Sequence, residues 1–233
     1  MEQFAEPGIP SDPIYTALFI PNATTTCMDL PPAGTCQLTT CPAVQGSSAS
    51  AGTVQLTGTS SANTLTLLPQ PSAGSGTYYP VEFFSTQNWS LGPITITAPG
   101  DAAPGFTGGV VVPPMPDVLA PSLSSWTTLD TSQDLPVAWS PQSSDVLVLL
   151  EAGGFPFPGT EADSSAAIEC VFSGPSGAGT LQAAQMKALK AQSSSYGTLV
   201  IASAASAVVT EGGWHVTINA INAGADADGL TLE

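Results

Sequence analysis

The feature that most constrains the fold is a series of short runs in which apolar and polar residues alternate. GTVQLTG (52–58), NTLTLLP (63–69) and GPITITAPG (92–100) show this period-two pattern. Each run is bounded by Gly, Pro, Ser or Asn, which is typical of β-strands separated by tight turns. Comparable runs extend through the chain, at 14–20, 76–84, 108–114, 124–130, 134–140, 145–153, 166–174, 197–205 and 214–222.

Strands at this spacing predict an all-β protein, built as one large β-sandwich or two tandem sandwiches of the immunoglobulin-like or jelly-roll type. PPMPD (113–117) indicates a rigid joint between two series of strands. We therefore expect an extended N-terminal segment with a disulfide-stapled loop over 1–50. A first sandwich module or half follows over 51–116, and a second over 117–233.

One segment departs from the strand pattern. TLQAAQMKALKAQ (180–192) consists of good helix formers, and its two lysines lie in the second half, where cations favour the helix dipole. We expect one short surface helix there, with Thr180 capping its start. The residues expected on its apolar face are Leu181, Ala184, Ala188 and Leu189.

The four cysteines indicate the compartment. Cys27, Cys36 and Cys41 lie within fifteen residues, and Cys170 lies far downstream. Zinc sites usually combine a close Cys pair with further Cys or His, and a reactive thiol needs a basic neighbour, so neither pattern fits. An even number of cysteines favours two disulfides in an oxidising compartment. Three pairings are open, and we expect one bridge inside the cluster and one long bridge to Cys170.

The charge balance excludes several partners. The formal net charge is −16, with two lysines and no arginine, so no basic face can bind nucleic acid or an anionic membrane. No apolar run is long enough to cross a bilayer. The first residues lack the pattern of a secretory signal, which we expect to have been removed from an extracytoplasmic protein.

Catalytic patterns are weak, and we expect a protein that is not an enzyme. His215 is the only histidine and is expected on the outward face of its strand, opposite Trp214. VFSGPSGAGT (171–180) lacks the lysine of a phosphate-binding loop and predicts a tight turn instead. One alternative is an acid-active hydrolase with paired carboxylates. Its candidates are Glu82, Glu151, Glu169 and Glu211.

The expected role is binding or surface structure, with a polysaccharide or a surface protein as partner. Aromatic rings near turns suggest a carbohydrate-binding module as another alternative, because exposed rings stack on sugars. The residues proposed for this contact are Tyr79, Trp89, Phe155 and Phe157. Calcium is the one cofactor that the sequence suggests, at Asp226 and Asp228, because alternating carboxylates before a glycine bind hard cations.

The second half of the chain resembles a group of uncharacterised bacterial proteins. The motifs are DLPVAWS, DVLVLLEAG, IECVFSGPSGAGTLQAAQMKAL and SAVVTEGGWHVTINA, with TCQLTTC and SAGTVQLTG upstream. They are similar to secreted or lipid-anchored β-sandwich proteins of myxobacteria and related bacteria, over about residues 36–222. The resemblance implies a cell-envelope or extracellular location. It implies no defined activity and no catalytic residues, and no cysteine of a lipid-attachment motif is present.

Overall fold

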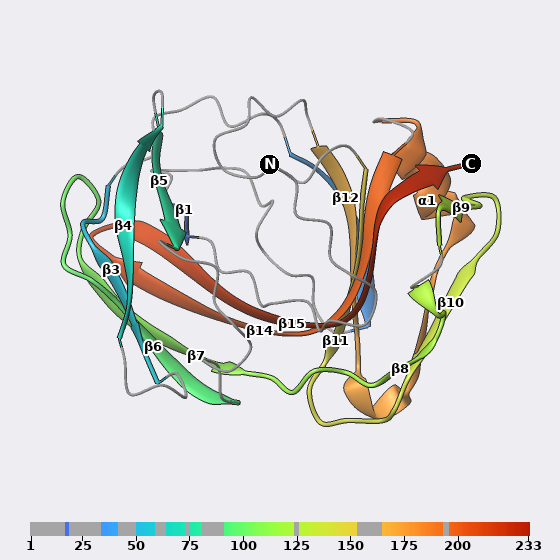
Figure 1. Ribbon diagram of the computed structural model, residues 1–233, viewed down its shortest axis with the longest axis horizontal. Helices are drawn as coiled ribbons and strands as arrows, with labels where there is room; N and C mark the ends of the chain where they lie inside the picture. Colours follow the sequence, from blue (N-terminus) through green and yellow to red (C-terminus); the bar gives the residue numbers. More distant parts are fainter. Residues whose placement is uncertain are drawn as a thin grey trace.

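The computed structural model describes residues 17–18, 34–41, 50–58, 64–72, 75–80, 91–123, 126–152, 165–192 and 196–233. Within them the protein is all-β, with antiparallel sheets, one strongly curled, and one short helix, so the predicted class is confirmed (Figure 1). No helix in these ranges is long and apolar enough to cross a membrane.

Sheet A has six strands, all from the first half of the chain. The order is β1-β5-β4-β3-β6-β7. The strands are β1 (Ala17–Leu18), β3 (Val54–Thr57), β4 (Leu65–Ser72), β5 (Ser75–Pro80), β6 (Gly92–Ala98) and β7 (Phe106–Val112). The alternation in β3 and β6 places apolar residues on one face and polar residues on the other, as the period-two pattern predicts.

Sheets B and C form the second half of the fold. Sheet B has the order β2-β12-β11-β14-β15-β9, and sheet C the order β13-β10-β8. The strands of sheet B are β2 (Thr35–Cys41), β9 (Thr128–Leu129), β11 (Val146–Ala152), β12 (Ser165–Phe172), β14 (Tyr196–Glu211) and β15 (Trp214–Leu232). Those of sheet C are β8 (Val118–Ala120), β10 (Leu135–Trp139) and β13 (Ala178–Leu181).

A long hairpin, β14–β15, joins the two halves. Its open end lies in sheet B, and its turn lies beside sheet A, as the curved red ribbons in Figure 1 show. The register shifts near Gly197 and again near Ala202, and such irregularities bend a strand. The hairpin, which lies entirely after residue 116, therefore contributes side chains to both halves of the fold.

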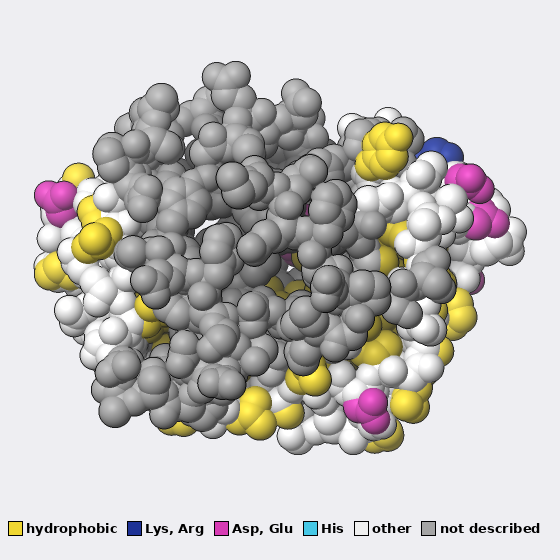
Figure 2. Space-filling view, in the orientation of Figure 1, with side chains coloured by type: hydrophobic (Ala, Val, Ile, Leu, Met, Phe, Trp, Pro, Cys, Tyr) yellow, Lys and Arg dark blue, Asp and Glu magenta, His cyan; other side chains and the backbone are white. Residues whose placement is uncertain are grey.

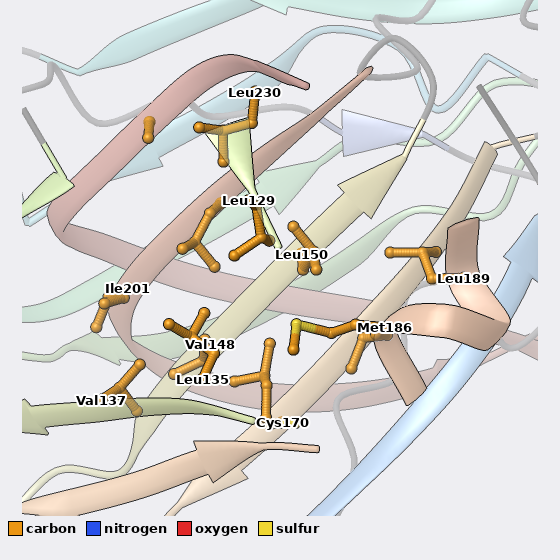
Figure 3. Close-up of a cluster of buried hydrophobic side chains, with 14 of the residues drawn as sticks. Leu129, Leu135, Val137, Val148, Leu150, Cys170, Met186, Leu189, Ile201 and Leu230 are labelled. Carbon is orange, nitrogen blue, oxygen red and sulfur yellow. The ribbon is translucent and has the colours of Figure 1, made fainter. Parts of the chain in front are cut away.

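Two hydrophobic cores lie along this hairpin. The larger lies between sheet B, sheet C and the helix, and it includes Leu150, Leu199 and Leu230. Figure 3 shows Met186 of this core between Leu150 and Cys170. The smaller lies between sheet A and the hairpin turn, and it includes Leu56, Ile94 and Ile218. Trp214 and Val216 pack against the smaller core, as their alternation with His215 predicts.

The helix is shorter than expected. α1 spans Ala183–Lys190, and Thr180 lies in β13, so the predicted cap is wrong. The N–H of Ala183 instead donates to the carboxylate of Asp134, 2.8 Å away. Leu181 and Leu189 are buried as expected, but Ala184 is exposed. Met186, which the predicted face omits, is fully buried in the larger core (Figure 3).

The glycine-rich turn before β13 is structural. A short 3-10 helix (Gly174–Ser176) ends at Gly177, whose φ of 68° favours glycine. A Cβ on Gly174 would overlap the carbonyl oxygen of Ser144. The same Gly174 accepts a 2.9 Å hydrogen bond from the indole N–H of buried Trp139. The turn therefore locks β10 into the larger core, as expected for a tight turn.

The long disulfide joins Cys36 to Cys170, across 134 residues. These cysteines face each other on β2 and β12, so part of the segment expected as a stapled loop is a strand of sheet B. The predicted bridge to Cys170 is confirmed, and it indicates an oxidising, extracytoplasmic environment. Cys27 and the side chain of Cys41 lie outside the described residues, so the short-range bridge stays a prediction.

Candidate functional site

The aromatic residues proposed for carbohydrate stacking fall mostly outside the described structure. Trp89, Phe155 and Phe157 lie in undescribed ranges. Tyr79 lies in β5, opposite Leu68 of β4, and only its backbone is described. Their role in binding therefore stays a prediction.

Two of the candidate carboxylates come together on sheet B. Glu169 of β12 lies opposite Leu149 of β11, and Glu151 of β11 lies two residue pairs further along, opposite Ala167. Both carboxylates therefore share one face as diagonal neighbours, with Cα atoms about 7–8 Å apart. Glu211 is exposed at the hairpin turn, far along β14, and Glu82 lies outside the described residues.

The environment of Glu169 indicates a structural carboxylate. Its side chain is 8% exposed, and Oε2 accepts a 2.9 Å hydrogen bond from the amide Nε2 of Gln37 on β2. The residue points away from Ile168 and Cys170, as the alternation in β12 predicts. A buried carboxylate held by a neighbouring amide links two strands of the sheet. The hydrolase alternative stays a prediction.

The Asp-Gly segment near the C-terminus is part of β15 and not a loop. Leu230 pairs with Gly197, and Ala227 pairs with Leu199, so Asp228 and Gly229 together oppose one residue of β14. This arrangement is a β-bulge, and Gly229 has the positive φ, 66°, that such a bulge favours. The described residues contain no cluster of three or more His, Cys, Asp or Glu suited to a metal. A structural need therefore accounts for the glycine, and calcium binding at Asp226 and Asp228 stays a prediction.

The outer face of sheet A carries an array of threonines. We call this surface the threonine face, and it consists of Gln55, Thr57, Thr66, Thr95, Thr97 and Thr107. One row runs across four strands, because Gln55 pairs with Thr66 on β4 and with Thr97 on β6, and Thr97 pairs with Thr107 on β7. A second row joins Thr57 to Thr95.

The spacing of this array follows from strand geometry. Neighbouring strands lie about 4.7–4.9 Å apart, and residues on the same face of one strand recur about every 6.6 Å. All members except the half-buried Thr66 are exposed. Each threonine presents a hydroxyl and a methyl group, so the face offers hydrogen-bonding and apolar contacts at regular intervals.

No charged residue lies in the strands of sheet A. Between residues 50 and 116 the sequence contains only Glu82 and Asp101 as charged residues, and both lysines lie in α1, in the other half. At the left edge of the molecule, Figure 2 shows mostly white and yellow groups, with one magenta acidic group among them. A partner with a dense charge therefore finds no ion-pairing group on the threonine face.

At one end the threonine face becomes apolar. Val111 of β7 is 60% exposed and pairs with exposed Pro93 of β6, on the same side of the sheet as Thr95. Leu91, just before β6, is 64% exposed. The surface thus combines an uncharged polar area with an apolar margin, and such combinations mark interaction sites more often than isolated exposed residues do.

Sequence reasoning identified the strands of this surface but not the surface. The signal was present in TVQLT and ITIT, where threonine and glutamine occupy alternate positions. The cross-strand register that aligns them into rows depends on pairing between distant segments, which one sequence does not fix.

No known protein family, curated protein or solved structure matches this chain.

Proposed function

We propose that this chain is an extracytoplasmic binding protein without catalytic activity, and that its threonine face binds a neutral polysaccharide. The observation that carries the proposal is an exposed, uncharged array of threonines on a protein with a formal charge of −16. The proposal makes the carbohydrate-binding alternative more specific, with a sheet face as the contact instead of loop aromatics.

The charge distribution supports a neutral ligand. A protein of this net charge repels polyanions such as nucleic acids and acidic polysaccharides. A cationic partner finds no carboxylate in the strands that form the threonine face. A neutral polymer is not repelled by the net charge and needs no ion pair at the threonine face.

The shape and chemistry of the face also fit a polysaccharide. Sugar rings present apolar C–H faces and hydroxyl edges, and the threonine methyl and hydroxyl groups complement both. Val111 and Pro93 add apolar area at the margin, where a ring can pack. The row from Thr66 to Thr107 spans four strands, which provides several contacts along one extended chain.

The test is retention of the protein by insoluble neutral polysaccharides, including cellulose, chitin and a β-glucan, with soluble acidic polysaccharides as competitors. We expect saturable retention by a neutral polymer, with little effect of salt because no ion pair forms. The T95K/T97K double variant should bind about tenfold more weakly or worse, since each lysine would place an unpaired charge in the contact.

The matched control is Thr180→Lys, an exposed threonine on β13 of sheet C, which should leave retention unchanged. Equal retention of the double variant and the control would contradict the proposed face. Release of sugar into the supernatant at low pH would instead favour the hydrolase alternative, and Glu151→Gln and Glu169→Gln would then locate the activity. Retention by no polysaccharide would favour a surface protein as partner.

A further inference from the structure

Strand β2 occupies one edge of sheet B and is far from its partner in sequence. Within the described part of the chain, β2 pairs with β12 alone, from Thr35 opposite Val171 to Cys41 opposite Ser165. No other described segment pairs with its outer side. Among the described residues, β2 is therefore held in sheet B from one side only.

The side chains of β2 add little to the core. Thr35 is exposed, and Cys36 and Leu38 are only partly buried against the larger core. The residues that they cover on β12 are fully buried, since Ile168 and Cys170 have no exposed surface. β2 therefore covers buried side chains of β12, while its own side chains stay partly exposed.

Three matched pairs select β2 for this edge. Leu38 lies opposite Ile168, the amide of Gln37 donates to Glu169, and Cys36 is bonded to Cys170. Only the last pair is covalent. Because 134 residues separate the two cysteines, an unbonded β2 would have to close a long loop to return to its place.

We propose that the Cys36–Cys170 disulfide is a latch on an exchangeable strand, and that opening it turns the edge of β12 into a docking site for β2 of a second copy of this chain. The occupant is specified by the pairs named above, since a second copy supplies the same leucine, glutamine and cysteine. Reciprocal exchange gives a closed dimer, and one-way exchange gives a chain of copies. This inference does not depend on the ligand of the threonine face.

The bond chemistry balances with an organic disulfide as oxidant. Two thiols of glutathione open the latch and leave as glutathione disulfide, which yields two protein thiols. In the docked pair, Cys36 of one copy and Cys170 of the other lose two electrons and two protons to glutathione disulfide. One intermolecular disulfide forms, and two glutathione thiols leave.

The first test measures hydrogen exchange in the C36S/C170S variant against the oxidised wild type, at low protein concentration. We expect amides of β2 to exchange about tenfold faster or more, which corresponds to about 1.4 kcal/mol of lost local stability, while amides of β11 keep their protection. Unchanged protection of β2 would contradict the proposal that the disulfide holds β2 in place, because packing alone would then hold the strand. Loss of protection in β11 would overturn it as well, because the strand would not be separable.

The second test uses two single variants that can complement each other only between copies. Cys170→Ser retains Cys36, and Cys36→Ser retains Cys170, so a Cys36–Cys170 bond in their mixture must join two molecules. We expect a covalent heterodimer after incubation with glutathione disulfide, with the Cys36–Cys170 peptide identified by mass spectrometry. Absence of this linked peptide, with both variants folded by circular dichroism, would overturn docking by a second copy.

A matched pair of substitutions tests the specificity of the docked strand. Leu38→Asp, added to the Cys170→Ser copy, should reduce the yield of heterodimer several-fold because a carboxylate would face buried Ile168. Leu119→Asp, at a leucine that is 64% exposed and away from β2, should leave the yield unchanged. Equal yields for the two variants would show random thiol collision and contradict strand docking.

Discussion

The hairpin β14–β15 contributes to two cores, and the side chains that it supplies to them differ in how deeply they are buried. To the larger core it contributes Leu199, Ile201 and Leu230. Toward sheet A it buries only Ile218 and Ala220 among the described residues, and its other contacts with the smaller core are partly buried, namely Ala205, Ala207, Val209, Trp214 and Val216. Small residues let two sheets approach closely, and β7 has Gly108 at that contact.

This difference corresponds to a difference in surface chemistry. The half built on sheets B and C carries both lysines, most of the acidic residues and the described disulfide. The half built on sheet A has no charge in its strands, and its outer face is threonine-rich. The comparison teaches that one half is organised for stability and that the other presents a neutral surface. The predictions below test this division, from the largest effect to the smallest.

Trp139→Ala should cause the largest loss of stability. The side chain is 1% exposed, lies 6.1 Å from the ring of Phe172 and donates to Gly174. Truncation of a buried tryptophan costs about 3–5 kcal/mol in the free energy of unfolding. Urea unfolding measures this loss. Trp139→Phe should cost about 1–3 kcal/mol, because the carbonyl of Gly174 loses the indole donor, the shortest of its hydrogen bonds. No loss of stability in Trp139→Phe would show that the hydrogen bond contributes nothing.

Gly108→Val should weaken the contact between sheet A and the hairpin. A Cβ at this position would lie 2.5 Å from Cγ2 of Val209 and 2.6 Å from Cδ1 of Ile218. Overpacking of this kind costs about 1–3 kcal/mol. Hydrogen exchange should accelerate in β6 and β7 more than in β11. The control is Thr107→Val, on the exposed side of the same strand. If Gly108→Val accelerates hydrogen exchange in β11 as much as in β6 and β7, the two halves do not respond separately.

Asp134→Ala should weaken the start of α1. The carboxylate accepts from the N–H of Ala183, which is at the first position of the helix. Loss of such a cap costs about 0.5–2 kcal/mol in unfolding free energy. The control is Asp101→Ala, at an exposed aspartate in the other half. If both variants unfold at the same urea concentration, the bond from Asp134 does not stabilise the helix.

The smallest effect concerns Asp130. The side-chain and backbone hydrogen bonds of Ser132 hold the pKa of this exposed carboxyl below its ordinary value, and the N–H donor lies 2.8 Å from Oδ1. A lowered folded pKa stabilises the fold above the unfolded value of about 3.9, and this contribution disappears as the pH falls through the folded pKa. Ser132→Ala should raise the pKa of Asp130 without restoring it fully. NMR titration of the carboxyl carbon measures the change, and an unaltered pKa would assign the effect to the backbone bond alone.

The sequence predicted the strands well where their alternation is local. The runs at 52–58, 92–100, 134–140 and 145–153 each contain one strand with the expected faces. The prediction failed where pairing decides the conformation. β2 and β13 have weak local patterns and become strands because β12 and β10 provide partners.

The length of the hairpin could not be predicted from either of its strands. Residues 223–233 contain Ala, Gly and Asp, which disfavour strands, and yet they complete β15 because β14 lies beside them. The two bulges that bend the hairpin depend on the same pairing. The threonine face was missed for the same reason, since its rows exist only after β3, β4, β6 and β7 are placed in register.

The measurement that tests the central claim most directly is hydrogen exchange with and without a soluble oligosaccharide of the polymer that retains the protein. The account predicts slower exchange in β3, β6 and β7, with no change in β10, β11 and β13. Protection confined to sheets B and C, or protection absent from sheet A at saturating oligosaccharide, would contradict the threonine face as the binding surface.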